Sequence, residues 1–240
     1  MPLAHSVIAE LKKLGTPAKA KTSRWFFKTG KGQYGYGDVF FGVTVPEQRK
    51  IAKRFRDLPL AEISKLLKNR VHECRLTAIF ILDGQYARGD EATREHIARF
   101  CLSHKKRINN WDLVDSFAPY VLGPQLLNKN RSLLYSLARS KNLWERRIAI
   151  IATSAFIRKN QYDDTLKIAA LLVRDTHDLI HKAVGWMLRE VGNRSLGTEE
   201  AFLKKHAAAM PRTMLSYATE KFPEKKRRMY LAMRAKRSRS

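Results

Sequence analysis

The stretch Asn109–Ser116 contains the residue types best suited to chemistry in this chain. Its pattern predicts the first turns of a helix, with Asn109 as the N-cap and Asp112 in a capping position three residues later. Trp111 and Asp115 are four residues apart, so they share one helix face. A carboxylate kept beside an aromatic plane in a very basic chain is either held in an ion pair or does chemistry. The sequence leaves both interpretations open.

The composition indicates a polyanionic partner. The chain has 240 residues, 44% of them hydrophobic, which is enough for a sizeable core. Lys and Arg number 47 against 22 Asp and Glu, giving a formal net charge of +25. The simplest polyanions are DNA and RNA. We expect no membrane partner, since no run of about 18 apolar residues could span a bilayer. We also expect no signal peptide, because no basic segment precedes an apolar one at the N-terminus.

The two cysteines, Cys74 and Cys101, make no disulfide framework and are interpreted as buried thiols in a reducing compartment. His72 lies close to Cys74, but no second ligand pair follows, so we expect no metal site. With DNA as the partner, we expect a cytoplasmic protein, associated with the nucleoid if the source is bacterial.

Apolar spacing predicts a first helix over residues 7–14, ended by Gly15 and Pro17, and a second over residues 18–27. The stretch Lys28–Asp38 contains four glycines and is predicted to be a loop. One interpretation is a basic loop near a backbone phosphate. The other is a connector whose tyrosines cover the core.

From Pro46 onward the pattern is helical almost without a break, and no alternating run indicates a sheet. The sequence therefore predicts an all-α fold. One helix is predicted from Pro46 and the next from about Leu60. The helices predicted after these cover residues 73–85, 93–103, 109–122, 131–139, 143–157, 162–173, 176–191, 198–209 and 211–221.

Four of these helices repeat a pattern. The segments that begin at Val71, Asn110, Leu143 and Leu179 each open a longer apolar helix after a shorter one, at spacings of 33 to 39 residues. This spacing is typical of two-helix repeats of the HEAT type, which stack into a superhelical solenoid with one concave face. We expect a single domain over residues 1–223. The basic residues 224–240 are interpreted as a DNA-contacting disordered tail or as a solvated end.

Aromatic and basic residues near the helix starts would line that concave face. Trp144 and Arg147 share a helix face and could hold a phosphate, or the arginine could simply stack on the ring. Gly185, before Trp186, lies in mid-helix, where glycine costs about 1 kcal/mol of helix stability relative to alanine. Its presence predicts that another group approaches the helix backbone closely there, and a neighbouring helix alone would be enough to explain it. The candidate phosphate contacts, each otherwise a solvated charge, are Arg146, Arg147, Lys182, Arg189 and Arg212.

Three segments together resemble the AlkD-like DNA alkylation repair glycosylases over roughly residues 5–222. They begin at Trp111 (Trp-Asp-Leu-Val-Asp-Ser), at Leu143 (Leu-Trp-Glu-Arg-Arg-Ile-Ala) and at Lys182 (Lys-Ala-Val-Gly-Trp-Met-Leu-Arg-Glu). The glycine-rich loop followed by Asp38–Pro46 is also similar to that family. The resemblance implies a HEAT-like solenoid with a basic concave groove for duplex DNA.

The resemblance also implies an activity, the hydrolytic release of N3- and N7-alkylated purines without deep extrusion of the lesion. It implies Asp115 as the catalytic carboxylate, with Trp111 and Trp186 packing around the damaged nucleotide. Arg147 matches a phosphate-contacting arginine. A tyrosine of some members falls on Phe26 here, so its ring is kept and its hydroxyl is lost.

The chemistry of the residues agrees with that activity. An alkylated purine is cationic and already a good leaving group, so a carboxylate beside the sugar suffices to stabilise the oxocarbenium-like transition state. We expect no cofactor, and a monomer on double-stranded DNA. Two other functions stay open: a non-catalytic nucleic-acid-binding solenoid with a structural Asp115, and a scaffold for an acidic protein.

Overall fold

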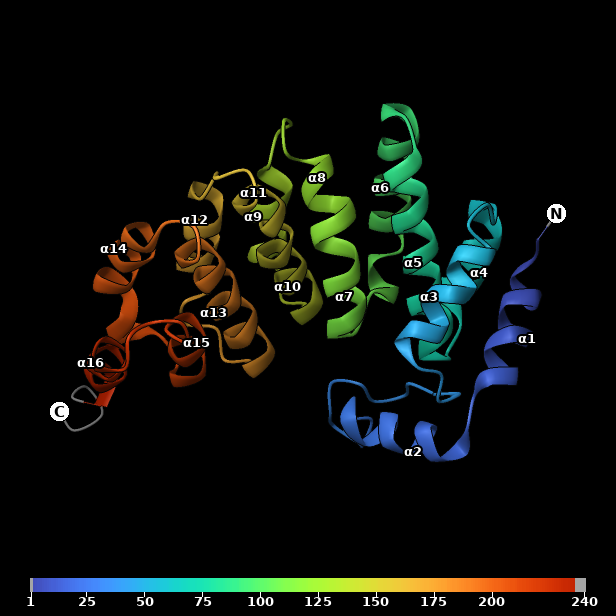
Figure 1. Cartoon of the computed structure of the whole chain (residues 1–240), viewed down its shortest axis with the longest axis horizontal. Coiled ribbons are helices and arrows are strands. Elements are labelled where there is room, and N and C mark those ends of the chain that lie inside the picture. The colour runs from blue at the N-terminus through green and yellow to red at the C-terminus, as the bar shows by residue number, and fades with distance from the viewer. Residues whose placement is uncertain (1, 236–240) are drawn as a thin grey trace. The chain divides into compact units, whose positions relative to one another are not determined.

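A computed structural model describes residues 2–235, without the side chains of residues 234 and 235, and these residues are largely helical (Figure 1). Across this range there is no β-strand beyond an isolated bridge between Val39 and Val71, so the all-α prediction is confirmed. None of the helices in the described range is both long and apolar enough to cross a membrane. The chain divides into two compact units, residues 1–117 and 118–240.

Unit 1 is built around α5, which packs against α1, α3, α4, α6 and α7. The first eleven residues of α5 are all buried, because helices surround this part on every side. The elements of unit 1 are α1 (Ala4–Leu14), α2 (Pro17–Phe26), α3 (Val45–Arg54), α4 (Leu60–Lys68), α5 (His72–Arg88), α6 (Glu91–Ser103), η1 (Lys105–Arg107) and α7 (Trp111–Phe117).

The second helix, α2, is packed differently from the others. Only Ala20 of its ten residues is buried, and Figure 1 shows α2 lying across the end of the bundle formed by α1 and α3. The following segment Lys28–Asp38 is a loop, as predicted. Tyr34 is half-buried and its hydroxyl lies 3.5 Å from the Phe26 carbonyl oxygen, whereas Tyr36 is 67% exposed. The interpretation of the loop as a connector whose tyrosines cover the core therefore fails for Tyr36.

Unit 2 opens with a π-helix, η2 (Ala118–Leu122), where a regular α-helix to residue 122 is predicted. Pro119 accounts for the difference, since it has no backbone N–H to donate to the α-helical ladder. The Pro119 carbonyl oxygen accepts a hydrogen bond from Arg158 at 2.6 Å. The remaining elements are α8 (Gly123–Gln125), α9 (Ser132–Ala138), α10 (Leu143–Ala152), α11 (Ser154–Ile157), α12 (Asp163–Leu172), α13 (Asp178–Gly192), α14 (Leu196–His206), η3 (Ala207–Ala209), α15 (Arg212–Ala218) and α16 (Glu224–Ala235).

Helices in unit 2 pack as consecutive pairs, α9 with α10 and α12 with α13, and the second helices α10, α13 and α15 contact one another in turn. This is the packing expected of stacked two-helix repeats. A Cβ on Gly185 would lie 2.4 Å from the Met214 carbonyl oxygen, so the predicted close approach is confirmed and the partner is α15. One detail of the prediction is wrong: α6 has 13 residues and α7 only seven, so the longer helix comes first there.

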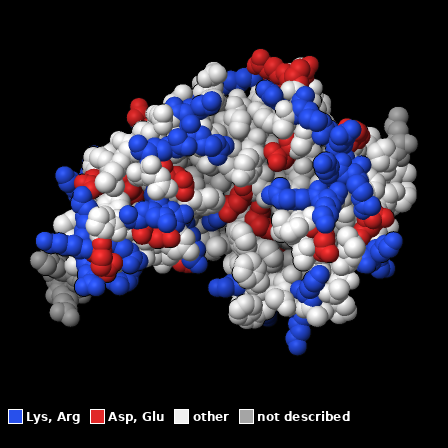
Figure 2. All heavy atoms as spheres, in the orientation of Figure 1, with Lys and Arg blue, Asp and Glu red and all other residues white. Residues whose placement is uncertain are grey.

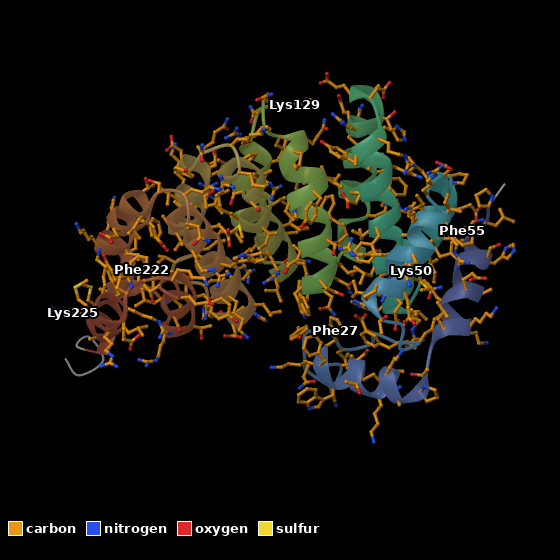
Figure 3. All side chains as sticks on the ribbon, viewed as in Figure 1. Phe27, Lys50, Phe55, Lys129, Phe222 and Lys225 are labelled. Atoms are coloured by element: carbon orange, nitrogen blue, oxygen red, sulfur yellow. The ribbon has the colours of Figure 1, made fainter. Side chains whose placement is uncertain are left out.

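The basic C-terminal segment is helical as far as it is described. In α16, Tyr230 is buried and packs edge-on against Phe222, and Lys226 pairs with Glu200 of α14. Figure 3 labels Phe222 and Lys225 at the start of this segment. The segment interpreted from its sequence as a disordered tail or a solvated end thus begins with a packed helix. Its last residues, 236–240, lie outside the described range.

Candidate active site

Trp111 is the first residue of α7 and belongs to a cluster of aromatic rings. Its indole stacks on Phe27, with ring centroids 5.4 Å apart and planes 17° from parallel. Phe26 meets the same indole edge-on at 5.8 Å. Figure 3 labels Phe27 at the end of α2 that lies nearest to α7. The structure thus brings together Trp111 and Phe26, 85 residues apart in the sequence, in one half-exposed aromatic wall.

Asp115 lies one turn further along α7 and is half-buried. The helix is regular from Trp111 to Phe117, so the carboxylate and the indole share one face of it, as the spacing predicts. The residues between them, Leu113 and Val114, are fully buried and fix the rotation of the helix against α5. The arrangement can present a negative charge beside an aromatic surface.

A buried network of charged side chains lies behind this wall. His72, only 2% exposed, directs Nε2 to Asp112 at 2.7 Å and Nδ1 to Asp38 at 3.2 Å. Arg75 donates to the other oxygen of Asp38 at 2.7 Å. Two carboxylates therefore face one imidazole and one guanidinium. No group of three or more acidic, histidine or cysteine side chains in the described range is arranged to hold a metal ion.

The sequence interpretation of Asp112 and Asn109 needs correction. Asp112 does accept a hydrogen bond from the Leu113 amide, but its other oxygen binds His72, so it is a member of the buried network rather than only a cap. The residue that caps α7 is Asn110, whose carbonyl accepts the first helical hydrogen bond from Val114. Asn110 rather than Asn109 takes the cap position, because its side-chain amide also donates to Asp38 at 3.3 Å. Asp38 is too far away in the chain for the local sequence to reveal this contact.

Within this network, the surroundings of His72 and of Asp38 shift their pKa values. Burial lowers the pKa of His72, but the charge and hydrogen bond of Asp112, with the hydrogen bond to Asp38, outweigh burial and raise that pKa to about 9. Burial raises the pKa of Asp38, and the hydrogen bond from His72 with the charges of Arg75 and His72 more than compensates, leaving it below its usual value. At neutral pH His72 is therefore an imidazolium that donates to both carboxylates.

The start of α5 also anchors the loop that leads to the aromatic wall. Glu73, which is buried, accepts hydrogen bonds from the backbone amides of Phe41, Gly42 and Val43 at 2.7 to 3.2 Å. Gly42 has a φ of 83°, and a Cβ there would lie 2.4 Å from the Thr16 carbonyl oxygen. Only glycine permits this close approach, which holds the loop against the start of α2.

Unit 2 carries the other predicted site residues. Trp186, on α13, is half-buried and its Nε1 donates to Glu190 at 3.1 Å. Arg189 pairs with Glu220, and Arg146 pairs with Asp175 at 2.7 Å. Arg147 is 5% exposed and donates to the Leu179 carbonyl oxygen at 2.6 Å. These arginines thus have partners within the unit, and phosphate contacts by them stay a prediction.

The other candidates in unit 2 are more accessible. Lys182 is 40% exposed and pairs with Asp178 one turn before it, at 2.8 Å. Arg212 is exposed at the start of α15. Trp144 is half-buried in the first turn of α10. Lys182 and Arg212 are therefore better placed than Arg146 or Arg147 to meet a large anion.

A family model described as DNA alkylation repair enzyme matches residues 7–222, nearly the whole chain. The chain belongs to the DNA alkylation repair enzyme family. This agrees with the resemblance carried by the Trp111, Leu143 and Lys182 segments. No curated protein matches the chain.

Two solved structures are similar to this family member. A protein described as a predicted DNA alkylation repair enzyme from Enterococcus faecalis has a TM-score of 0.68 at 18% identity, over 88% of this chain and 97% of that one. AlkD2 from Streptococcus mutans is also similar, with a TM-score of 0.48 at 16% identity, over 97% of this chain and 98% of that one. The first likeness supports the all-α fold, and the second is too weak to carry an argument.

Sequence reasoning missed the network that supports the site of this family member. The pairing of Asp38 with His72 and Arg75, and of His72 with Asp112, was not predicted because these partners lie 34 to 40 residues apart in the chain. One signal was available: Asp38 is the only acidic residue between Glu10 and Glu47. An isolated carboxylate at the end of a basic loop is a candidate for a buried ion pair.

Proposed function

We propose that the chain is a monofunctional DNA glycosylase that hydrolyses the N-glycosidic bond of N3- and N7-alkylated purines in duplex DNA. The observation that carries this proposal is the half-buried Asp115 one turn after Trp111, on a helix that the His72–Asp112–Asp38 network fixes in place. Membership of a DNA alkylation repair enzyme family supports the substrate class. We propose that it acts as a monomer in the cytoplasm.

The reaction needs little from the protein besides a placed negative charge. In an N7- or N3-alkylated purine, the bond from C1′ of the deoxyribose to the base nitrogen breaks with its electron pair moving to the base. The base leaves neutral, and the sugar becomes an oxocarbenium-like cation. Asp115 is proposed to face that cation and to position a water molecule, whose oxygen bonds to C1′ while its proton passes to the carboxylate or to solvent.

The aromatic residues have a second proposed role. The indole of Trp111, backed by Phe27, offers a face that favours a cation through its quadrupole. Phe26 supplies a ring without a hydroxyl, so it can pack against the nucleotide but cannot donate a hydrogen bond. Trp186 is proposed to pack against the damaged nucleotide, and Arg147 to contact the DNA backbone. No cofactor or metal is required for these steps.

The test is base release from methylated duplex DNA, comparing the wild type with Asp115→Asn. We expect Asp115→Asn to lower the rate by about 10²–10³ while DNA binding and unfolding temperature are kept, because only the charge is removed. Asp57→Asn, at an exposed carboxylate of the same unit, is the matched control and should be fully active. Full activity of Asp115→Asn would refute the assignment, and a wild type that binds DNA without releasing bases would favour the non-catalytic alternative.

A further inference from the structure

The end of α2 and the glycine-rich loop expose aromatic rings that the proposed function does not use. Trp25 is 80% exposed, and Tyr36 is 67% exposed. Neither ring belongs to the cluster around Trp111, which takes Phe26 and Phe27 instead. Large aromatic side chains left this open in a folded protein commonly mark a surface that binds a partner.

These rings lie in a stretch of unusual charge. Residues 11–37 contain seven Lys or Arg and no Asp or Glu. In Figure 2, the atoms at the place of α2 are Lys, Arg and uncharged residues only. Lys21 precedes Trp25 by one helical turn and is exposed on the same face. The exposed members of the set are Lys12, Lys13, Lys19, Lys21, Arg24, Lys28 and Lys31.

The loop is held so that Tyr36 lies beside the end of α2. The Gly35 amide donates to the Lys28 carbonyl oxygen at 3.2 Å. A Cβ on Gly35 would lie 2.3 Å from the Phe27 carbonyl oxygen, so only glycine allows the loop to fold back this closely. Tyr36 follows directly, so its backbone lies next to the end of the helix that carries Trp25. We call the surface formed by Lys21, Arg24, Trp25, Lys28 and Tyr36 the α2–loop face.

We propose that the α2–loop face binds unpaired DNA nucleotides, with Trp25 and Tyr36 stacking on bases and the lysines and arginine attracting the backbone. Duplex DNA offers phosphates but hides the faces of its bases inside the stack. Exposed rings beside exposed cations therefore match a strand whose bases are open, as in other single-strand-binding surfaces. An acidic protein would satisfy the cations but would give the rings no flat partner. This inference does not depend on base release.

The experiment measures binding of the full chain to a labelled 12-residue oligothymidylate and to a fully paired 12-base-pair duplex of unmodified DNA. We expect Trp25→Ala and Tyr36→Ala each to weaken single-strand binding by about 5-fold or more, since stacking contributes about 1–3 kcal/mol per base. Duplex binding should change less than about 2-fold. Tyr120→Ala, at a 50%-exposed tyrosine of unit 2, is the matched control and should alter neither.

Three outcomes would overturn the proposal. The first is unchanged single-strand affinity in the Trp25→Ala/Tyr36→Ala double variant. The second is an equal loss on single strand and duplex, which would mean that the rings serve the fold or general DNA attraction. The third is that the wild type is a dimer and the double variant a monomer, while both bind single-stranded DNA equally well. The face would then be a contact between two copies of the chain. Base release is assayed separately, so a chain without glycosylase activity would still answer this question.

Discussion

In unit 1 the charges of His72, Arg75, Asp38 and Asp112 beside α7 are buried and shared, whereas in unit 2 the candidate cations Lys182 and Arg189 pair with acidic side chains that are about half exposed. His72 serves two carboxylates at once, and Arg75 serves one of the same two. By contrast, Arg189 has Glu220 and Lys182 has Asp178. A shared buried charge is costly to disturb, while a surface pair costs little to open.

Under the proposed function, this difference corresponds to two tasks. The buried network in unit 1 fixes the first turn of α7, so that Trp111 and Asp115 keep one orientation, as a reaction that depends on a placed charge requires. The pairs in unit 2 can exchange an acidic partner for a phosphate, which suits a surface that meets DNA only part of the time. Altering one charge in each region tests this difference.

The largest effect is expected for Asp112→Asn. The substitution leaves the His72 imidazolium facing an amide in a buried site, and removing one partner of a buried pair typically costs about 3–5 kcal/mol. Denaturant unfolding measures the loss. Asp178→Asn, which removes the partner of Lys182 in unit 2, is the matched change and should cost less than about 1 kcal/mol. Equal losses in the two variants would erase the distinction between the regions.

The network also predicts a pH dependence of stability. The folded pKa of His72 is raised to about 9 from 6.5, so its contribution is complete below pH 6.5 and is lost as the pH rises through 9. The loss is on the order of 3 kcal/mol. Burial, with the nearby charge of Glu200, raises the pKa of Glu199 to about 8, so its ionisation makes stability fall progressively as the pH rises from 4.5 to 8 and keeps it lower above pH 8.

The difference between the wild type and His72→Gln isolates the histidine, because Glu199 is present in both proteins. The free energy of unfolding should fall less between pH 6.5 and 9 in His72→Gln than in the wild type. Parallel curves for the two proteins would mean that His72 is neutral in the folded state and that the network is held by hydrogen bonds alone.

The sequence predicts those features of the fold and site that depend on interactions between residues close together in the chain. Apolar spacing located the helices, and glycine in mid-helix located the approach of α15 at Gly185, because both signals are local. The choice of Asn110 over Asn109 as the cap depended on Asp38, 72 residues away. The π-helix at Pro119 was not predicted. The packing of α16 was not predicted either, since a charge-rich segment gives no sign of the buried Tyr230 that anchors it.

Tyr230→Ala should lower the stability of unit 2 by about 1.5–3 kcal/mol, the contribution of one buried large side chain. Met229→Ala, at the exposed neighbouring position, should change it little. Deleting residues 224–240 should therefore destabilise unit 2 in addition to weakening binding to all DNA sequences alike, with lesion preference unchanged. Full stability of the deletion variant would show that α16 does not contribute to the unit, and a changed lesion preference would show that this segment reads bases.

The smallest effect concerns the salt dependence of DNA binding. Each phosphate contact contributes about −0.9 to the slope of log affinity against log salt. Arg212 is exposed at the start of α15, so Arg212→Ala should make the slope shallower by about one contact. Arg146 already binds Asp175 and the carbonyl oxygens of Ser140 and Lys141, so Arg146→Ala should lower stability and leave the slope unchanged. If Arg146→Ala reduces the slope as much as Arg212→Ala, the pair with Asp175 opens on DNA and the arginine is a phosphate contact. A wild type with no salt dependence would instead favour a protein partner over DNA.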